Sequence, residues 1–263
     1  MRFTSRSSTV TFEGKRVAPA ELRRVWADTT VVNGLWEAPM YERFLTGIRE
    51  SNRRLPKRQK ARVLACDPPI DWSRVQAISD AAPHLRRDSF CASLLEREVY
   101  NKGRRALVVM GSAHVTSRHM NGDALSNVVT MIEEKYPGSV FTILTWDGNM
   151  KDNALIEQKL SAAQAPSVTP TRDTWIGALL ALPLKAPTRT RVGGGEAVVE
   201  AVKLSNPPTL DQVADALLYL GPSSTLTRSV PAADHFSPDE LHELERRHRI
   251  MFGLPLDRNA LFR

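Results

Sequence analysis

One short stretch, residues 105–115 (RALVVMGSAHV), contains His114, the side chain in this chain best suited to chemistry. The apolar run Leu107–Met110 is typical of a strand that is buried on both faces. Gly111 and Ser112 then open a slim turn, so we expect His114 to project from the carboxyl end of that strand. Ligands bind at this edge in open α/β sheets. The pattern predicts that His114 is a general base or a metal or haem ligand, with Gly111 and Ser112 beside it in a ligand-binding site.

Two charged residues at the start of the preceding predicted helix can support this histidine. Arg87 can bind a carboxylate or phosphate through two N–H groups. Asp88 can orient the imidazole, so the three residues together make an acid–base arrangement. Asp67 follows a short predicted strand and is expected at the same sheet edge. Structural roles explain the same residues: Asp88 suits a helix N-terminus, and His114 can simply donate to a backbone carbonyl.

A second histidine raises the possibility of a metal. His119 lies five residues after His114, and two imidazoles on one loop can converge on a divalent ion. The spacing matches neither a helical H-x-x-x-H pair nor a zinc ribbon. Arg118, next to it, is a candidate ligand-binding residue, and an exposed loop is the alternative for both. The chain contains no nucleophile elbow, P-loop or dinucleotide fingerprint, so no nucleotide site is expected.

Composition restricts the partners. The net charge of +7 invites a nucleic-acid hypothesis, but the densest basic run, residues 49–62, includes Glu50 and has no interleaved aromatic residues. We therefore predict no nucleic-acid partner, no membrane span and a small-molecule ligand or substrate, with the oligomeric state left open. Cys66 and Cys91 have no paired spacing and are predicted as buried free thiols. With no hydrophobic leader at the N-terminus, this predicts a cytoplasmic protein.

Alternating helix and strand patterns predict the fold class. Hydrophobic periodicity, capping residues and breakers favour a single α/β domain over residues 1–263, with a mostly parallel sheet flanked by helices and its site at the carboxyl edge of the strands. Residues 1–16 are expected to be disordered, and residues 162–208 to be a long irregular loop or lid. Helices are predicted over residues 40–52, 88–102, 123–136, 209–218 and 237–252, and strands over residues 62–67, 105–110 and 139–145.

Two motifs resemble a known group of proteins. The helix start RDSFCA at residues 87–92 resembles R-D-x-x-M-A, and LVVMGSAHV at residues 107–115 resembles the strand–G-x-x-H motif that follows it. Both are similar to motifs of the α/β group that contains ChaN-like haem-binding proteins, erythromycin-esterase-like hydrolases and Tiki/TraB metalloproteases. The resemblance covers residues 85–145, and the flanking stretches look like an uncharacterised branch of that group.

The resemblance implies roles for three residues. His114 would be the second site histidine of the group, with Arg87 and Asp88 as its neighbours. Cys91 stands where the group usually has Met. The group's first motif, a strand that ends in G-E-x-H or G-T-x-H, has no counterpart before Pro19, so we expect an N-terminally incomplete site.

Three functions are therefore open from the sequence. The first is a hydrolase-like domain with a His114-centred site that works with or without a metal ion. The second is a haem- or metal-binding protein that uses His114, for which one axial ligand is enough. The third is an inactive or N-terminally incomplete domain whose remaining residues serve packing.

Overall fold

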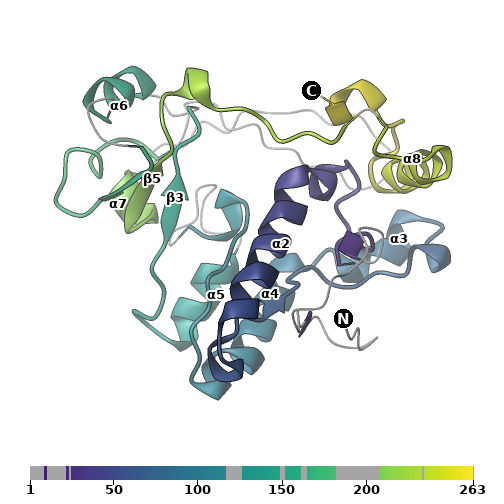
Figure 1. Cartoon of the computed structure of the whole chain (residues 1–263), viewed down its shortest axis with the longest axis horizontal. Coiled ribbons are helices and arrows are strands. Elements are labelled where there is room, and N and C mark those ends of the chain that lie inside the picture. The colour runs from purple at the N-terminus through teal and green to yellow at the C-terminus, as the bar shows by residue number, and fades with distance from the viewer. Residues whose placement is uncertain are drawn as a thin grey trace. The chain divides into compact units, whose positions relative to one another are not determined.

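A computed structural model describes residues 9–10, 22–23, 25–116, 126–148, 152–160, 165–181, 208–232 and 234–262. They divide into two compact units (Figure 1). Unit 1 comprises Met1–Phe90 and Arg228–Arg263, and unit 2 comprises Cys91–Thr227. Each unit is described by itself.

Unit 1 is mainly helical. Its longer helices are α2 (Pro39–Arg54) and α8 (Pro238–Phe252), and it also contains the single turn α3 (Ile78–Ala81). Two short strands, β1 (Thr9–Val10) and β2 (Val63–Leu64), pair antiparallel. The helices predicted over residues 40–52 and 237–252 are confirmed. They could be predicted because the signals that start and stop a helix lie within it or next to it.

The amino terminus of α8 shows such a local signal. The Ser237 hydroxyl accepts a hydrogen bond from the Glu240 N–H at 3.3 Å, and the Glu240 carboxylate accepts one from the Ser237 N–H at 2.8 Å. This reciprocal capping satisfies donors that the first helical turn leaves unpaired. At the other end Gly253 has φ +68°, a conformation that glycine adopts without a steric penalty, and the helix stops there.

The core of unit 1 forms where α8 covers the chain around α3. Trp72 is fully buried, and its indole N–H donates to the Thr29 carbonyl at 2.9 Å. From α8, Leu244, Ile250 and Met251 pack against this cluster. A smaller cluster contains Phe236, Leu256 and Leu261, and Leu244 packs against both clusters.

Unit 2 contains a small mixed sheet. Its strands are β3 (Ile143–Thr145), β4 (Ser167–Pro170) and β5 (Ala216–Tyr219). The order is β3-β5-β4, with β3 parallel and β4 antiparallel to the central strand. Leu144 lies opposite Leu217, and Val168 lies opposite Leu218. The chain therefore combines helices with strands, but the sheet that the structure describes has three strands and is not mostly parallel.

Short helices accompany this sheet. They are α5 (Val128–Lys135), α6 (Asn153–Leu160) and α7 (Leu210–Val213), together with the last part of α4 (Arg87–Glu98), which begins in unit 1. Figure 1 shows α6 and α7 near β3 and β5. Buried residues of the sheet, of α6 and α7 and of the adjoining chain form one cluster, which includes Trp146, Ile156, Leu210, Leu217 and Tyr219.

The predicted strand over residues 105–110 is wrong. Residues 104–110 belong to no strand, and the side chains of Leu107 and Val109 are 83% and 68% exposed. Val108 and Met110 are partly buried, so exposed and partly buried side chains alternate, as in an extended chain. The segment has no pairing partner among the described residues. Its apolar, β-branched composition favours a strand, but only another strand can supply the hydrogen bonds.

The structure differs from three further predictions. The strand predicted over residues 62–67 is only two residues long and pairs antiparallel with β1. The helix predicted over residues 209–218 ends at Val213, and β5 follows, because hydrogen bonds to β3 and β4 are available on both sides. Strand β4 lies inside the predicted irregular segment, of which residues 162–164 and 182–207 are outside the described residues. Of residues 1–16, only Thr9 and Val10 are described.

Two findings concern the predictions about a membrane span and the cysteines. Among the described residues, no helix is long and apolar enough to cross a membrane. The prediction of free thiols is wrong, since Cys66 and Cys91 are both disulfide-bonded. The argument for a reducing compartment depended on those thiols and loses its support.

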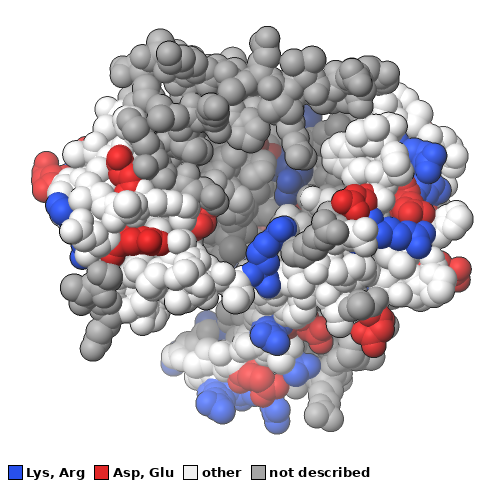
Figure 2. Space-filling view, turned by 90° about the horizontal axis from the view of Figure 1, so that it is seen from above, with Lys and Arg blue, Asp and Glu red and all other residues white. Residues whose placement is uncertain are grey.

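On the face drawn in Figure 2, acidic and basic side chains of the described residues lie next to one another.

Candidate functional site

His114 lies on a tight turn in unit 2. Ser112–His114 form one turn of 3-10 helix, in which the His114 N–H donates to the Gly111 carbonyl at 2.9 Å. Gly111 and Ser112 are exposed, and His114 is partly buried. The turn thus has the slim form expected from its small residues, although the segment before it is not a strand.

A buried asparagine holds this turn in place. Asn127 is 4% exposed, and its amide N–H groups donate to the Thr116 carbonyl at 2.9 Å and to the Ala113 carbonyl at 3.4 Å. Its amide oxygen accepts from the Thr130 N–H at 3.0 Å, which caps α5. One side chain therefore fixes both the His114 turn and the start of a helix. An asparagine before an apolar helical run is a recognisable cap signal, but its second contact to the turn has no sequence signature.

A second hydrogen bond ties the turn to the sheet. The Thr142 hydroxyl donates to the Val115 carbonyl at 3.2 Å. Thr142 immediately precedes β3, and its carbonyl accepts from the backbone N–H of Asp215 at 2.9 Å, where β5 is about to begin. This hydrogen bond therefore places Val115 at the amino ends of β3 and β5, whereas we expected the carboxyl ends. The expectation assumed that residues 105–110 run beside β3 as a parallel strand, and they do not.

In unit 1, two of the predicted site residues meet. The Arg87 Nε lies 2.5 Å from the Asp67 Oδ1, and both side chains are largely buried. Arg87 is the first residue of α4, and Asp88 lies in the first turn of that helix, where an acidic side chain is favourable. Asp67 was expected at a sheet edge, and in the structure it contacts Arg87. Because Asp67 binds Arg87, the guanidinium is held in one place with part of its charge balanced.

The predicted site residues thus fall into two sets, which the structure describes separately. Gly111, Ser112 and His114 belong to unit 2, whereas Asp67, Arg87 and Asp88 belong to unit 1. Arg118 and His119 lie outside the described residues. No group of three His, Cys, Asp or Glu side chains that could hold a metal ion occurs in the described part of the chain. Metal binding through His114 and His119 stays a prediction.

Comparison with protein-family models, with curated proteins and with solved structures finds no match for this chain. The resemblance to the ChaN-like, erythromycin-esterase-like and Tiki/TraB group is therefore carried by its two motifs alone. The candidate site has to be judged by its own chemistry.

Proposed function

We propose that this chain is a hydrolase-like protein in which His114 is the general base. An imidazole changes its charge near neutral pH, so it can take a proton from a water molecule that attacks an ester or amide carbonyl. The observation that carries the proposal is the support of the His114 turn by Asn127, Thr116 and Thr142, all three of them buried. Buried polar groups cost free energy unless they are hydrogen-bonded. Here their hydrogen bonds hold a turn that has little apolar surface of its own.

The motif resemblance also implies a role for Arg87, which lies in unit 1, whereas His114 lies in unit 2. A guanidinium stabilises the negative charge that develops on a carbonyl oxygen during hydrolysis. The proposed supporting roles of Arg87 and Asp88 come from the motif resemblance and are part of what the experiment must test. A mostly parallel sheet and a cytoplasmic location remain predictions from the sequence: the described sheet has one parallel and one antiparallel pair, and the disulfide-bonded cysteines count against a reducing compartment.

The direct test is the hydrolysis of p-nitrophenyl acetate by the full chain and by His114→Ala. We expect turnover above the rate in buffer, and a loss of about 100-fold or more in the variant, the usual contribution of a general base. His84→Ala is the matched control, because His84 is also partly buried and lies on a 3-10 turn, in unit 1. Its rate should equal that of the unmodified chain. Equal rates for His114→Ala and the unmodified chain would rule out the base.

The role of Asn127 can be tested separately. Asn127→Ser keeps a hydroxyl that can cap α5 but is too short to donate to the Ala113 and Thr116 carbonyls. We expect kcat to fall about tenfold with KM nearly unchanged, because the turn that positions His114 loosens while α5 stays folded. If kcat is unchanged, the clamp has no part in positioning the base.

A haem titration of the unmodified chain and of His114→Ala tests the second function, haem binding. An absorption band of bound haem that is present in the unmodified chain and absent in His114→Ala, without ester turnover, would replace hydrolysis by haem ligation. Turnover that a chelator abolishes would indicate that a metal takes part. If neither activity nor binding is found, the inactive-domain hypothesis is supported.

A further inference from the structure

Unit 1 contains a cavity of about 300 Å³ whose lining includes none of the predicted site residues. It lies between the chain around residues 23–37 and the first half of α8. Its volume is at the lower end of the range for small-molecule pockets, so it suits a compact ligand.

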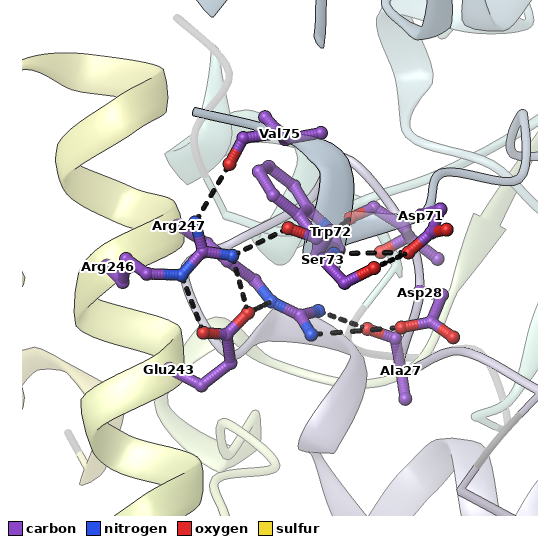
Figure 3. A network of polar contacts seen from close by, with 10 residues as sticks. Ala27, Asp28, Asp71, Trp72, Ser73, Val75, Glu243, Arg246 and Arg247 are labelled. Atoms are coloured by element: carbon purple, nitrogen blue, oxygen red, sulfur yellow. Dashed lines mark hydrogen bonds and ion pairs between the residues drawn. The ribbon is translucent and has the colours of Figure 1, made fainter. Parts of the chain in front are cut away.

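Charged side chains connect the two sides of this cavity. Arg23 donates from Nε to Glu37 at 3.0 Å and from Nη1 to Glu240 of α8 at 2.8 Å. Arg247 of α8 donates to Glu243 at 2.7 Å and to the Ala27 carbonyl at 2.7 Å, as Figure 3 shows. Two of them, Arg23 to Glu240 and Arg247 to Ala27, join residues more than 200 positions apart and connect the two walls of the cavity.

The cavity has an aromatic lining. The rings of Trp26, Trp36 and Phe236 border it. Trp36 also contacts the Tyr41 ring edge-on, with 4.9 Å between the ring centroids. The indole N–H groups of Trp26 and Trp36 are buried and have no acceptor among the described residues. A buried donor without an acceptor is unfavourable, so an oxygen atom that met either indole would be stabilised.

The charge of the lining is negative. Among the described lining residues, four carboxylates, Glu37, Asp239, Glu240 and Glu243, outnumber two guanidinium groups. Outside the lining, Arg246 also donates to Glu243, and His235 lies 2.8 Å from Glu37, so the excess of negative charge rests mainly on Asp239. Both guanidinium groups already donate to carboxylates of the lining. Asp239 is exposed in the first turn of α8, where an incoming cation can reach it.

We propose that this cavity binds a compact organic ammonium ion that also carries an oxygen acceptor. Aromatic faces attract an alkylammonium group, and the surplus of carboxylate charge favours a cation over a neutral or anionic molecule of the same shape. The oxygen is the partner that the two indole groups lack. The site uses residues of unit 1 only and does not depend on the proposed role of His114.

A pair of isosteric probes tests the charge requirement on the unmodified full chain. Choline carries a quaternary ammonium and a hydroxyl oxygen, and in 3,3-dimethyl-1-butanol a carbon replaces the charged nitrogen. We expect calorimetric titration to show choline binding about tenfold more tightly than the alcohol. Equal affinity for the two probes, or no saturable choline binding up to about 100 mM, would overturn the proposal.

Variants test the location. We expect Trp36→Leu and Asp239→Asn each to weaken choline binding about fivefold, because one removes an aromatic face and the other a negative charge. The controls are Trp175→Leu, a partly buried tryptophan of unit 2, and Asp257→Asn, an exposed aspartate outside the lining. Since Asp239 is exposed, its variant should fold even if Trp36→Leu does not. Choline affinity that is unchanged in Asp239→Asn and in any folded Trp36 variant would show that the cation binds elsewhere.

Discussion

Among the described acids of unit 1, Glu243 has the most strongly shifted pKa. Its two carboxylate oxygens accept hydrogen bonds from Arg246 at 2.7 and 2.9 Å, and one of them also accepts from Arg247 at 2.7 Å (Figure 3). The hydrogen bonds from Arg246 lower the pKa of Glu243 to about 2; burial opposes this shift, and Arg247 adds to it. Arg246 also donates to the carbonyls of Trp72 and Val75, so the acid joins α8 to the core of unit 1.

This shift makes the stability of unit 1 dependent on pH. The pKa of Glu243 is lower in the folded chain than in the unfolded chain, so its contribution is complete above pH 4.5 and is lost as the pH falls from 4.5 towards 2. The side chain is 38% exposed, and solvent screens the interaction, so we expect about 1 kcal/mol rather than the full value of the shift. Urea unfolding at pH 7 and pH 3 should show a smaller loss of stability in Glu243→Gln than in the unmodified chain.

The control for this experiment is Glu42→Gln, an exposed acid in the first turn of α2. Its unfolding should keep the pH dependence of the unmodified chain. If Glu243→Gln keeps it as well, the two arginines do not stabilise the folded state through this carboxylate.

At the scale of elements, α8 depends on its capping residue. Ser237 is exposed and packs against little, so its contribution comes from the hydrogen bond to the Glu240 N–H. We expect Ser237→Ala to lower the free energy of unfolding by about 1 kcal/mol, measured by urea denaturation. Ser237→Asn should restore most of the loss, because asparagine caps equally well. Equal stability of the alanine variant and the unmodified chain would contradict the role of the cap.

The His114 turn depends instead on hydrogen bonds from residues that are more distant in the sequence. Asn127 comes from the start of α5, and Thr142 from the residue before β3. Both elements also bury apolar side chains: Ile132 of α5 is 3% exposed, and Leu144 of β3 belongs to the apolar cluster of unit 2. A change that loosens either element should therefore move the turn as well.

At the scale of the whole molecule, the state of the cysteines is the feature most open to measurement. The chain has two cysteines, and both are disulfide-bonded. A thiol reagent should therefore find no reactive thiol in the urea-denatured chain until a reductant is added, and two thiols afterwards. Reduction should also lower the free energy of unfolding by about 2–4 kcal/mol, because the cross-link restricts the unfolded chain. Two thiols in the unreduced chain would contradict the disulfide.

The sequence by itself determined the features that local interactions stabilise. Residues 40–52 show a one-sided apolar pattern, and Ser237 with the acids after it marks the start of a helix; α2 and α8 form there. Helical hydrogen bonds join residues four apart, so a short stretch contains most of the information that it needs.

Only the tertiary structure decided which extended segments become strands. Residues 105–110 and 216–219 are both short apolar runs, yet only the second has neighbours on both sides and forms a strand. The pairing of β1 with β2, the disulfide-bonded cysteines and the contact of Thr142 with Val115 also join residues far apart in the chain. The physical reason is common to all of them: a strand, a disulfide or a side-chain clamp obtains its partner from a distant segment, and local composition does not specify which segment that is.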